Sequence, residues 1–165
     1  MTTHSFVDEN NNPVIGAMID LNSSEGQNFI DNEIINNDPN ILLYAKKSYA
    51  VGLPLDFKSR KENLKDADVS IKQHMYWGSM TSDRKIASAR DFGNMAAGIV
   101  SGRAGNDWNL TEIAFNTLQG SKEPIVSSKA QKVGWELGNK IYNIESQKII
   151  PTLIPNWNMN HIRNN

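Results

Sequence analysis

The amino-acid sequence predicts a mostly helical protein, folded as a single compact domain over residues 1–165, with an irregular N-terminal segment and an irregular C-terminal tail. Its 165 residues are the usual size of one domain. Hydrophobic residues make up 39% of the chain and charged residues 21%, as in ordinary globular proteins. Apolar residues recur between helix-capping residues and glycines along most of the chain, which is the pattern of successive helices.

The first third of the chain begins with a turn cluster, Asn10–Pro13, and continues with the short apolar run Val14–Leu21. That run is either a strand or a buried segment, and its periodicity does not separate the two. Ser23 or Ser24 then suits the N-cap of a helix over about 25–36, with an acidic residue in the first turn.

Asp38 and Pro39 predict the N-cap and the first residue of a second helix. This helix is expected to reach Val51, where Gly52 suits its end. The following segment, Gly52–Lys58, is expected to be extended because its proline disfavours helix in the preceding residue.

The middle of the chain predicts a short helix over Ile71–Trp77 and then the longest helix of the protein. Ser82 is the expected N-cap of that long helix, which covers about 83–103. It should end near Gly102 or Gly105.

Two more helices are expected in the last third. Asn109 and Glu112 have the spacing of a capping box, opening a helix that runs to Gln119. Ser127 or its neighbour begins a last helix, which should end at about Asn143. The proline-containing tail that follows is expected to be irregular but anchored by its apolar residues.

Composition excludes several kinds of site. The chain has no cysteine, which rules out disulfides, thiol nucleophiles and cysteine-ligated zinc. No apolar run approaches the roughly 18 residues of a membrane span. Residues 1–12 lack the basic and apolar regions of a signal peptide, so we expect any secretion to proceed without a cleavable signal.

Charge is unevenly distributed along the chain. Residues 1–45 hold seven acidic side chains and no lysine or arginine, whereas residues 46–90 hold ten basic and five acidic side chains. The basic middle either meets an acidic partner or phosphate backbone, or is covered by the acidic front of the same chain. A pI near 6.3 argues against broad electrostatic binding of nucleic acid.

The most informative stretch is Arg90–Gly102, where three glycines interrupt a helical pattern at a cost of roughly 1 kcal/mol each. Such glycines suit close approach to the helix. One interpretation is a helix-packing stripe of small residues at a spacing of four, made by Ala89, Gly93, Ala97 and Ser101. The other is the floor of a polar pocket, made by Asp91, Asn94, Gly98 and Ser101.

This stretch resembles the central motif of the bacterial polymorphic toxin type 44 family, in which an Asp-aromatic-Gly-Asn core is followed by spaced glycines. Upstream, Gly52–Lys58 resembles the family's Gly-Gly-Pro-Trp-Asp-Tyr-Lys segment, with Leu53 replacing the second glycine and Leu55 the tryptophan. The two segments agree with the family in order and spacing, and the resemblance covers about residues 45–140.

The resemblance implies an antibacterial effector that secretion machinery, such as a type VI system, delivers into a competing bacterium. A cognate immunity protein neutralises it in the producer. The family is described as mostly helical and as a predicted ribonuclease. Carried over residue by residue, the functional positions are Asp56, Lys58, Asp91 and Asn94.

Metal-independent cleavage of RNA needs a base, an acid and a cation for the phosphate charge. Asp56 or Asp91 suits the base if burial raises its pKa, and Lys58 suits the cation. Asn94 can donate hydrogen bonds to phosphate or base. The chain has no histidine pair at metal-ligand spacing and no glycine-rich phosphate loop, so no metal or cofactor is expected.

Substrate-binding candidates lie in the basic middle. Tyr76 and Trp77 suit stacking on a nucleobase, with His74 beside them and Gly98 in the pocket floor. The alternative for these three neighbours is a core-facing helix end with a satisfied histidine.

Two other functions stay open. A hydrolase of peptidoglycan glycan, acting in the target periplasm, needs two carboxylates about 5–9 Å apart. Asp56 and Asp91 would supply them. The second alternative is a non-enzymatic interaction module. A ribonuclease would act in the cytoplasm of the target instead.

Overall fold

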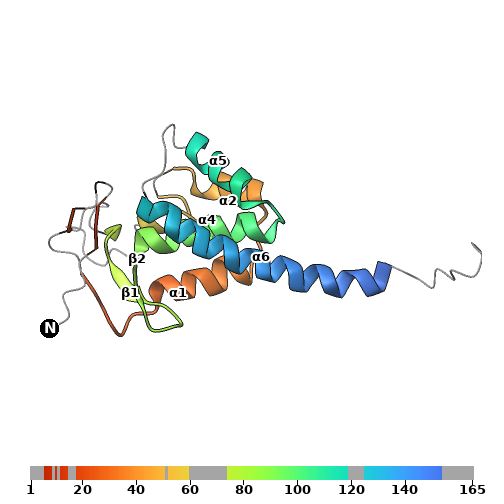
Figure 1. Cartoon of the computed structure of the whole chain (residues 1–165). Coiled ribbons are helices and arrows are strands. Elements are labelled where there is room, and N and C mark those ends of the chain that lie inside the picture. The colour runs from red at the N-terminus through yellow and green to blue at the C-terminus, as the bar shows by residue number, and fades with distance from the viewer. Residues whose placement is uncertain are drawn as a thin grey trace, which may run out of the picture.

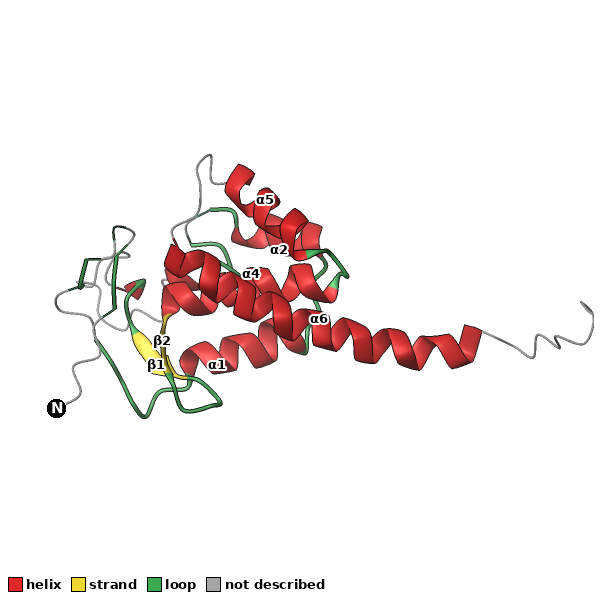
Figure 2. Ribbon diagram, in the orientation of Figure 1, coloured by secondary structure: helices red, strands yellow, loops and turns green. Residues whose placement is uncertain are grey.

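The computed structural model describes residues 6–8, 10, 12–14, 18–50, 52–59, 74–118 and 125–153 (Figure 1). These residues form a mostly helical fold, as the sequence predicts (Figure 2). In chain order the elements are α1 (Glu25–Phe29), the π-helix η1 (Ile30–Ile35), α2 (Ile41–Ser48), the 3-10 helix η2 (Phe57–Ser59), β1 (Gly78–Met80), β2 (Ile86–Ser88), α4 (Ala89–Arg103), α5 (Trp108–Leu118) and α6 (Ile125–Leu153). Among the described residues, no helix combines the length and the apolar content needed to cross a membrane.

Helix α4 lies at the centre of the fold, and α1, α2, α5 and α6 all contact it (Figure 2). Its apolar face supplies Phe92, which is fully buried. The core around it contains Phe29, Ile30, Ile34, Leu55, Phe57, Ala89, Ala96, Ile99 and Val100. The Phe29 ring stacks on that of Phe57 at 4.4 Å between centroids. The core therefore joins α1, η1, η2 and α4.

Helices α4 and α6 cross at backbone contact and run in the same direction, because Gly98 lies against Gln131 and Gly102 lies against Trp135. A Cβ atom on Gly98 would overlap the carbonyl oxygen of Gln131, and one on Gly134 would overlap that of Met95. Glycine is needed where two backbones approach this closely.

The packing stripe is displaced from the one expected. It contains Gly98 and Gly102, whereas Gly93, which belongs to the expected stripe, has only the amide nitrogen of Lys58 nearby, at 3.9 Å. The prediction of close helix approach is confirmed, but on a neighbouring face of α4.

The long helix begins six residues later than expected. Strands β1 and β2 pair antiparallel, with Ser79 opposite Ala87, and this ribbon occupies the first residues of the expected helix. Ser88 is therefore the N-cap of α4, and Ser82 lies in the turn between the strands. At the other end the expected boundary is correct, since α4 stops at Arg103 and Gly105 has a φ of 78°.

Helix α2 begins at Ile41, with Asn40 as its N-cap, since the Asn40 side chain accepts a hydrogen bond from the amide of Leu43 at 2.9 Å. The expected cap, Asp38, instead has a φ of 43° and lies 3.2 Å from the Arg103 guanidinium. The helix ends at Ser48, earlier than expected, and Val51 lies outside the described residues.

Three further segments differ from the expected bounds or conformation. The segment expected to be extended, Gly52–Lys58, contains turns and the start of η2. Asp107 rather than Asn109 opens α5, because its carboxylate accepts the Asn109 amide at 2.8 Å. Helix α6 continues ten residues past Asn143, and in Figure 1 its C-terminal end extends beyond the other helices.

The N-terminal part contributes isolated bridges. Ile19 pairs with Gly78 in parallel, which favours the strand interpretation of the apolar run that contains it. Val7 and Pro13 form an antiparallel bridge. Of the short helix expected over Ile71–Trp77, residues 71–73 lie outside the described residues, His74 is helical, and residues 75–77 form the turn that leads into β1.

Candidate active site

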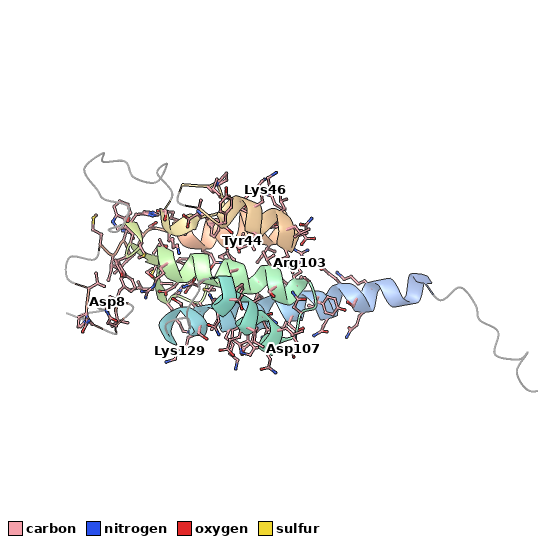
Figure 3. The ribbon with its side chains drawn as sticks, turned by 90° about the horizontal axis from the view of Figure 1, so that it is seen from above. Asp8, Tyr44, Lys46, Arg103, Asp107 and Lys129 are labelled. Carbon is pink, nitrogen blue, oxygen red and sulfur yellow. The ribbon has the colours of Figure 1, made fainter. Side chains whose placement is uncertain are left out.

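The two motif segments of the sequence lie against each other. The rings of Phe57 and Phe92 meet edge to face, with centroids 6.2 Å apart, and Gly93 lies beside the backbone of Lys58. The hydroxyl of Tyr44 donates to the carbonyl of Gly93 at 3.3 Å, and in Figure 3 Tyr44 lies on the side of α2 that faces α4. The segments meet through these aromatic and backbone groups.

The expected catalytic side chains have other surroundings. Asp91 forms a capping box, because its Oδ2 accepts hydrogen bonds from the amide of Ser88 at 3.0 Å and from the Ser88 hydroxyl at 2.7 Å. This contact stabilises the start of α4. Asn94 lies one turn further along the same helix, half-buried. The sequence prediction placed both residues together correctly but missed the structural role of the carboxylate.

Asp56 is buried, with 6% of its surface exposed. The pKa of Tyr44 is raised, first by burial of its hydroxyl and second by the negative charge of Asp56. Lys58 has an exposed side chain. Its carbonyl oxygen contacts Nδ1 of His74 at 3.2 Å. Neither Asp56 nor Lys58 lines the two cavities described below.

Gly98 does not provide a pocket floor. The space beside it is occupied by the backbone of α6 at Gln131 and Trp135. Its role in the structure is helix packing, which corrects the pocket interpretation of this residue.

The segment 74–77 is hydrogen-bonded to the first turn of α4. The amide of Arg90 donates to the carbonyl of Met75, and the amide of Ala89 donates to the carbonyl of Trp77. His74 and Trp77 face one another with ring centroids 5.5 Å apart. Tyr76 instead lies against the guanidinium of Arg90, at 5.4 Å from its ring centroid. The three predicted substrate-binding residues are therefore divided between two surroundings.

His74 is completely buried and contacts two hydrogen-bond acceptors. Its Nδ1 faces the Lys58 carbonyl at 3.2 Å, and its Nε2 faces Oε1 of Glu25 at 3.3 Å. A carbonyl oxygen only accepts, so Nδ1 carries a hydrogen. The imidazole therefore links the backbone of Lys58 to the carboxyl group of Glu25.

Glu25 is the exposed end of this pair, with 32% of its side chain accessible. Two cavities, of about 290 Å³ and about 420 Å³, share Glu25, Ser23 and Phe57 in their linings. The first also contains Asp20 and Trp77. The second also contains Asn28, Asn32 and Glu33. Glu25 therefore belongs to the lining of both cavities.

The second cavity lies along α1 and the π-helical turn that follows it. The residues at 25, 28, 29 and 32 follow the three-and-four spacing of one helix face. π-helical turns are rare and occur frequently at functional sites. The fold thus places a row of polar side chains beside Glu25.

No protein-family model, curated protein or solved structure matches this chain. In the part of the chain that the structure describes, no three His, Asp or Glu side chains gather as a metal site would require. The arrangement of groups around Glu25 is therefore the basis for a functional proposal.

Sequence reasoning had not suggested Glu25 and Asp20 as site residues. Glu25 was explained by its favourable place in the first turn of a helix, and Asp20 stood in an apolar run. The one available signal was His74, whose aromatic neighbours suggested a site.

Proposed function

We propose that this chain is an antibacterial effector domain that hydrolyses the glycan strands of peptidoglycan in the periplasm of a target bacterium. The observation that supports it is the position of Glu25, whose carboxyl group contacts the buried His74 and lines two cavities. A polymer cut within its length needs binding space on both sides of the reacting bond.

The lining of the groove suits a sugar. The ring of Trp77, which is half-buried, suits packing on the apolar face of a sugar ring, and amides such as those of Asn28 and Asn32 bond to its hydroxyls. Among the described lining residues there are carboxylates but no lysine or arginine. The negative charge of a phosphodiester would be repelled by this acidic lining.

Glycoside hydrolysis uses one carboxyl group as acid and a second as base or nucleophile. In the proposed reaction Glu25 protonates the leaving glycosidic oxygen as the bond from that oxygen to C1 breaks. A water molecule attacks C1 and gives its proton to the second carboxylate, and proton exchange with solvent then restores both groups. His74 positions the carboxyl group of Glu25 through its Nε2 contact. Asp20 lines the same cavity and supplies the second carboxylate. Its Oδ1 accepts the amide of Asn22 at 2.8 Å, which fixes the side chain on its turn.

A ribonuclease is the second candidate. It is favoured by the contact between His74 and the carbonyl of Lys58, because this contact places a lysine of the resembled motif beside a buried histidine. It ranks second because the side chain of Lys58 is exposed and lies outside both cavities. In either case a cognate immunity protein protects the producer, and secretion machinery delivers the domain.

Expression in bacteria with and without a periplasmic signal tests the proposal. Lysis only with export, together with release of soluble glycan fragments from purified peptidoglycan, supports the hydrolase. Toxicity only from the cytoplasm, with degraded RNA, would replace it with the ribonuclease. Normal growth in both cases would contradict both enzymatic functions and favour the alternative of a non-enzymatic interaction module.

The matched variants are Glu25→Gln and Glu136→Gln, the latter on the exposed face of α6. The first should lose fragment release by at least about 100-fold, as expected when a general acid is removed. The second should keep full activity. Equal activity in both variants would remove Glu25 from the mechanism.

A further inference from the structure

Arg90 is a buried cation with incomplete hydrogen bonding. Only 4% of its surface is exposed. Nη2 donates to the carbonyl of Val7 at 2.9 Å, while Nε and Nη1 have no hydrogen-bond partner among the described residues. Buried polar groups in folded proteins are nearly always paired, so such an exception requires an explanation.

Two neighbours on α4 share this property. Oδ1 of Asp91 lies 3.9 Å from Nε of Arg90, which is an ion-pair distance but too long for a hydrogen bond. Neither this oxygen nor Nδ2 of Asn94 has a hydrogen-bond partner within the described ranges. Arg90 and Asn94 are four residues apart and lie on one helix face. The start of α4 therefore carries unpaired donors on Arg90 and Asn94 and an unpaired acceptor on Asp91.

The N-terminal segment, described at residues 6–8, 10 and 12–14, contacts this cluster at Arg90. It is closed on itself by the bridge between Val7 and Pro13 and by the amide of Val14, which donates to Phe6 at 2.7 Å. Two contacts attach this segment to the rest of the fold. The Val7 carbonyl accepts a hydrogen bond from Arg90. The Phe6 ring packs against Gly78 so closely that a Cβ atom added there would lie 2.7 Å from it.

We propose that Arg90 is the recognition group of an oxyanion-binding site that the N-terminal segment covers. The Val7 carbonyl takes the place of one oxygen of a ligand carboxylate or phosphate group. The planar guanidinium fork suits either group, because it offers several donors in fixed directions. Asn94 adds a further donor, and the free oxygen of Asp91 accepts from a hydroxyl group beside the oxyanion. This site is independent of the proposed cleavage at Glu25.

The test uses the full chain with inorganic phosphate and sodium acetate as separate probes. The readout is the side-chain Nε–H resonance of Arg90 by NMR during each titration. Phe6→Ala weakens the attachment of the cover, so the open form is more populated and the apparent affinity should rise about tenfold over the unchanged protein. The probe that binds more tightly identifies the oxyanion as phosphate or carboxylate.

Arg90→Lys keeps the charge but loses the fork, and saturable binding should disappear. Arg84→Lys is the matched control, because Arg84 is exposed in the turn between β1 and β2, and it should titrate like the unchanged protein. If Arg90→Lys fails to fold, the Arg90 resonance in the unchanged protein and in Phe6→Ala still decides. A resonance that neither probe shifts in Phe6→Ala, or binding retained in a folded Arg90→Lys, would overturn the proposal.

Discussion

Phe57 and Phe92 meet edge to face, with their ring planes inclined by 81°. Each belongs to one of the two motif segments, and each stands between residues that the sequence had suggested as catalytic. Because the two rings face each other in the core, the motifs position the backbone at Lys58 and Gly93. Lys58 in turn supplies the carbonyl that orients His74. The two motif segments therefore support the contact between His74 and Glu25.

Phe92→Ala should lower the free energy of unfolding by about 3–5 kcal/mol, because it removes a fully buried ring that contacts α1 and η2. Urea denaturation followed by circular dichroism measures this. Leu42→Ala is the control, since Leu42 is 82% exposed and its loss should change stability by less than about 0.5 kcal/mol. Equal effects of the two changes would contradict the core described above.

The crossing of α4 and α6 predicts opposite results for two glycines of one helix. Gly98→Ala should destabilise the protein by about 3 kcal/mol, because the added methyl group overlaps backbone that cannot move aside. Gly93→Ala should leave stability unchanged or raise it by up to about 1 kcal/mol, because the space is open and alanine favours helix. Thermal unfolding compares them, and a stable Gly98→Ala variant would rule out the backbone contact.

The sequence predicted the helical class and the approximate place of α4 because glycines and caps are local signals. It did not predict where α4 begins. Ser82 and Ser88 are equally good caps locally, and the choice between them depends on the pairing of β1 with β2. Strand pairing is decided by contacts that a helical pattern does not contain.

The candidate site shows the same limit. His74 attracted notice because it stands beside two aromatic residues, but its partner Glu25 lies 49 positions earlier. Glu25 already had a sufficient local explanation at the start of a helix. A contact between two residues so far apart follows from the packing of α1 on the core, which sequence spacing does not reveal.

The start of α4 can be tested with two serines. Ser88→Ala should cost about 1 kcal/mol of stability, because the capping box with Asp91 is lost. Ser82→Ala, at an exposed turn position, should change stability by less than about 0.5 kcal/mol. Denaturant unfolding of both variants measures the difference. A larger cost at Ser82 would restore the helix start that the sequence suggested.

The variant His74→Gln tests whether the contact between His74 and Glu25 contributes to the proposed activity. Glutamine can still donate one hydrogen bond to Glu25, but its amide cannot exchange a proton with that carboxyl group as an imidazole can. We expect kcat for glycan release to fall by at least about 100-fold with KM nearly unchanged, and the shape of the pH profile to change. Trp77→Phe, which alters the cavity wall, should mainly raise KM. A His74→Gln variant with an unchanged pH profile would limit this histidine to a structural role.

Tyr44 should make the protein lose stability in alkaline solution. The folded state raises the pKa of this hydroxyl above its ordinary value of 10.0, through burial first and the charge of Asp56 second. The unfolded chain therefore releases the proton at lower pH than the folded chain, and stability is fully present below pH 10 and declines above it. The slope reaches at most about 1.4 kcal/mol per pH unit. Tyr44→Phe should remove this decline, whereas Tyr49→Phe, at an 81% exposed position, should retain it. Urea unfolding at several pH values between about 9 and 11 measures both slopes, and identical slopes in the two variants would show that the hydroxyl of Tyr44 is not shielded.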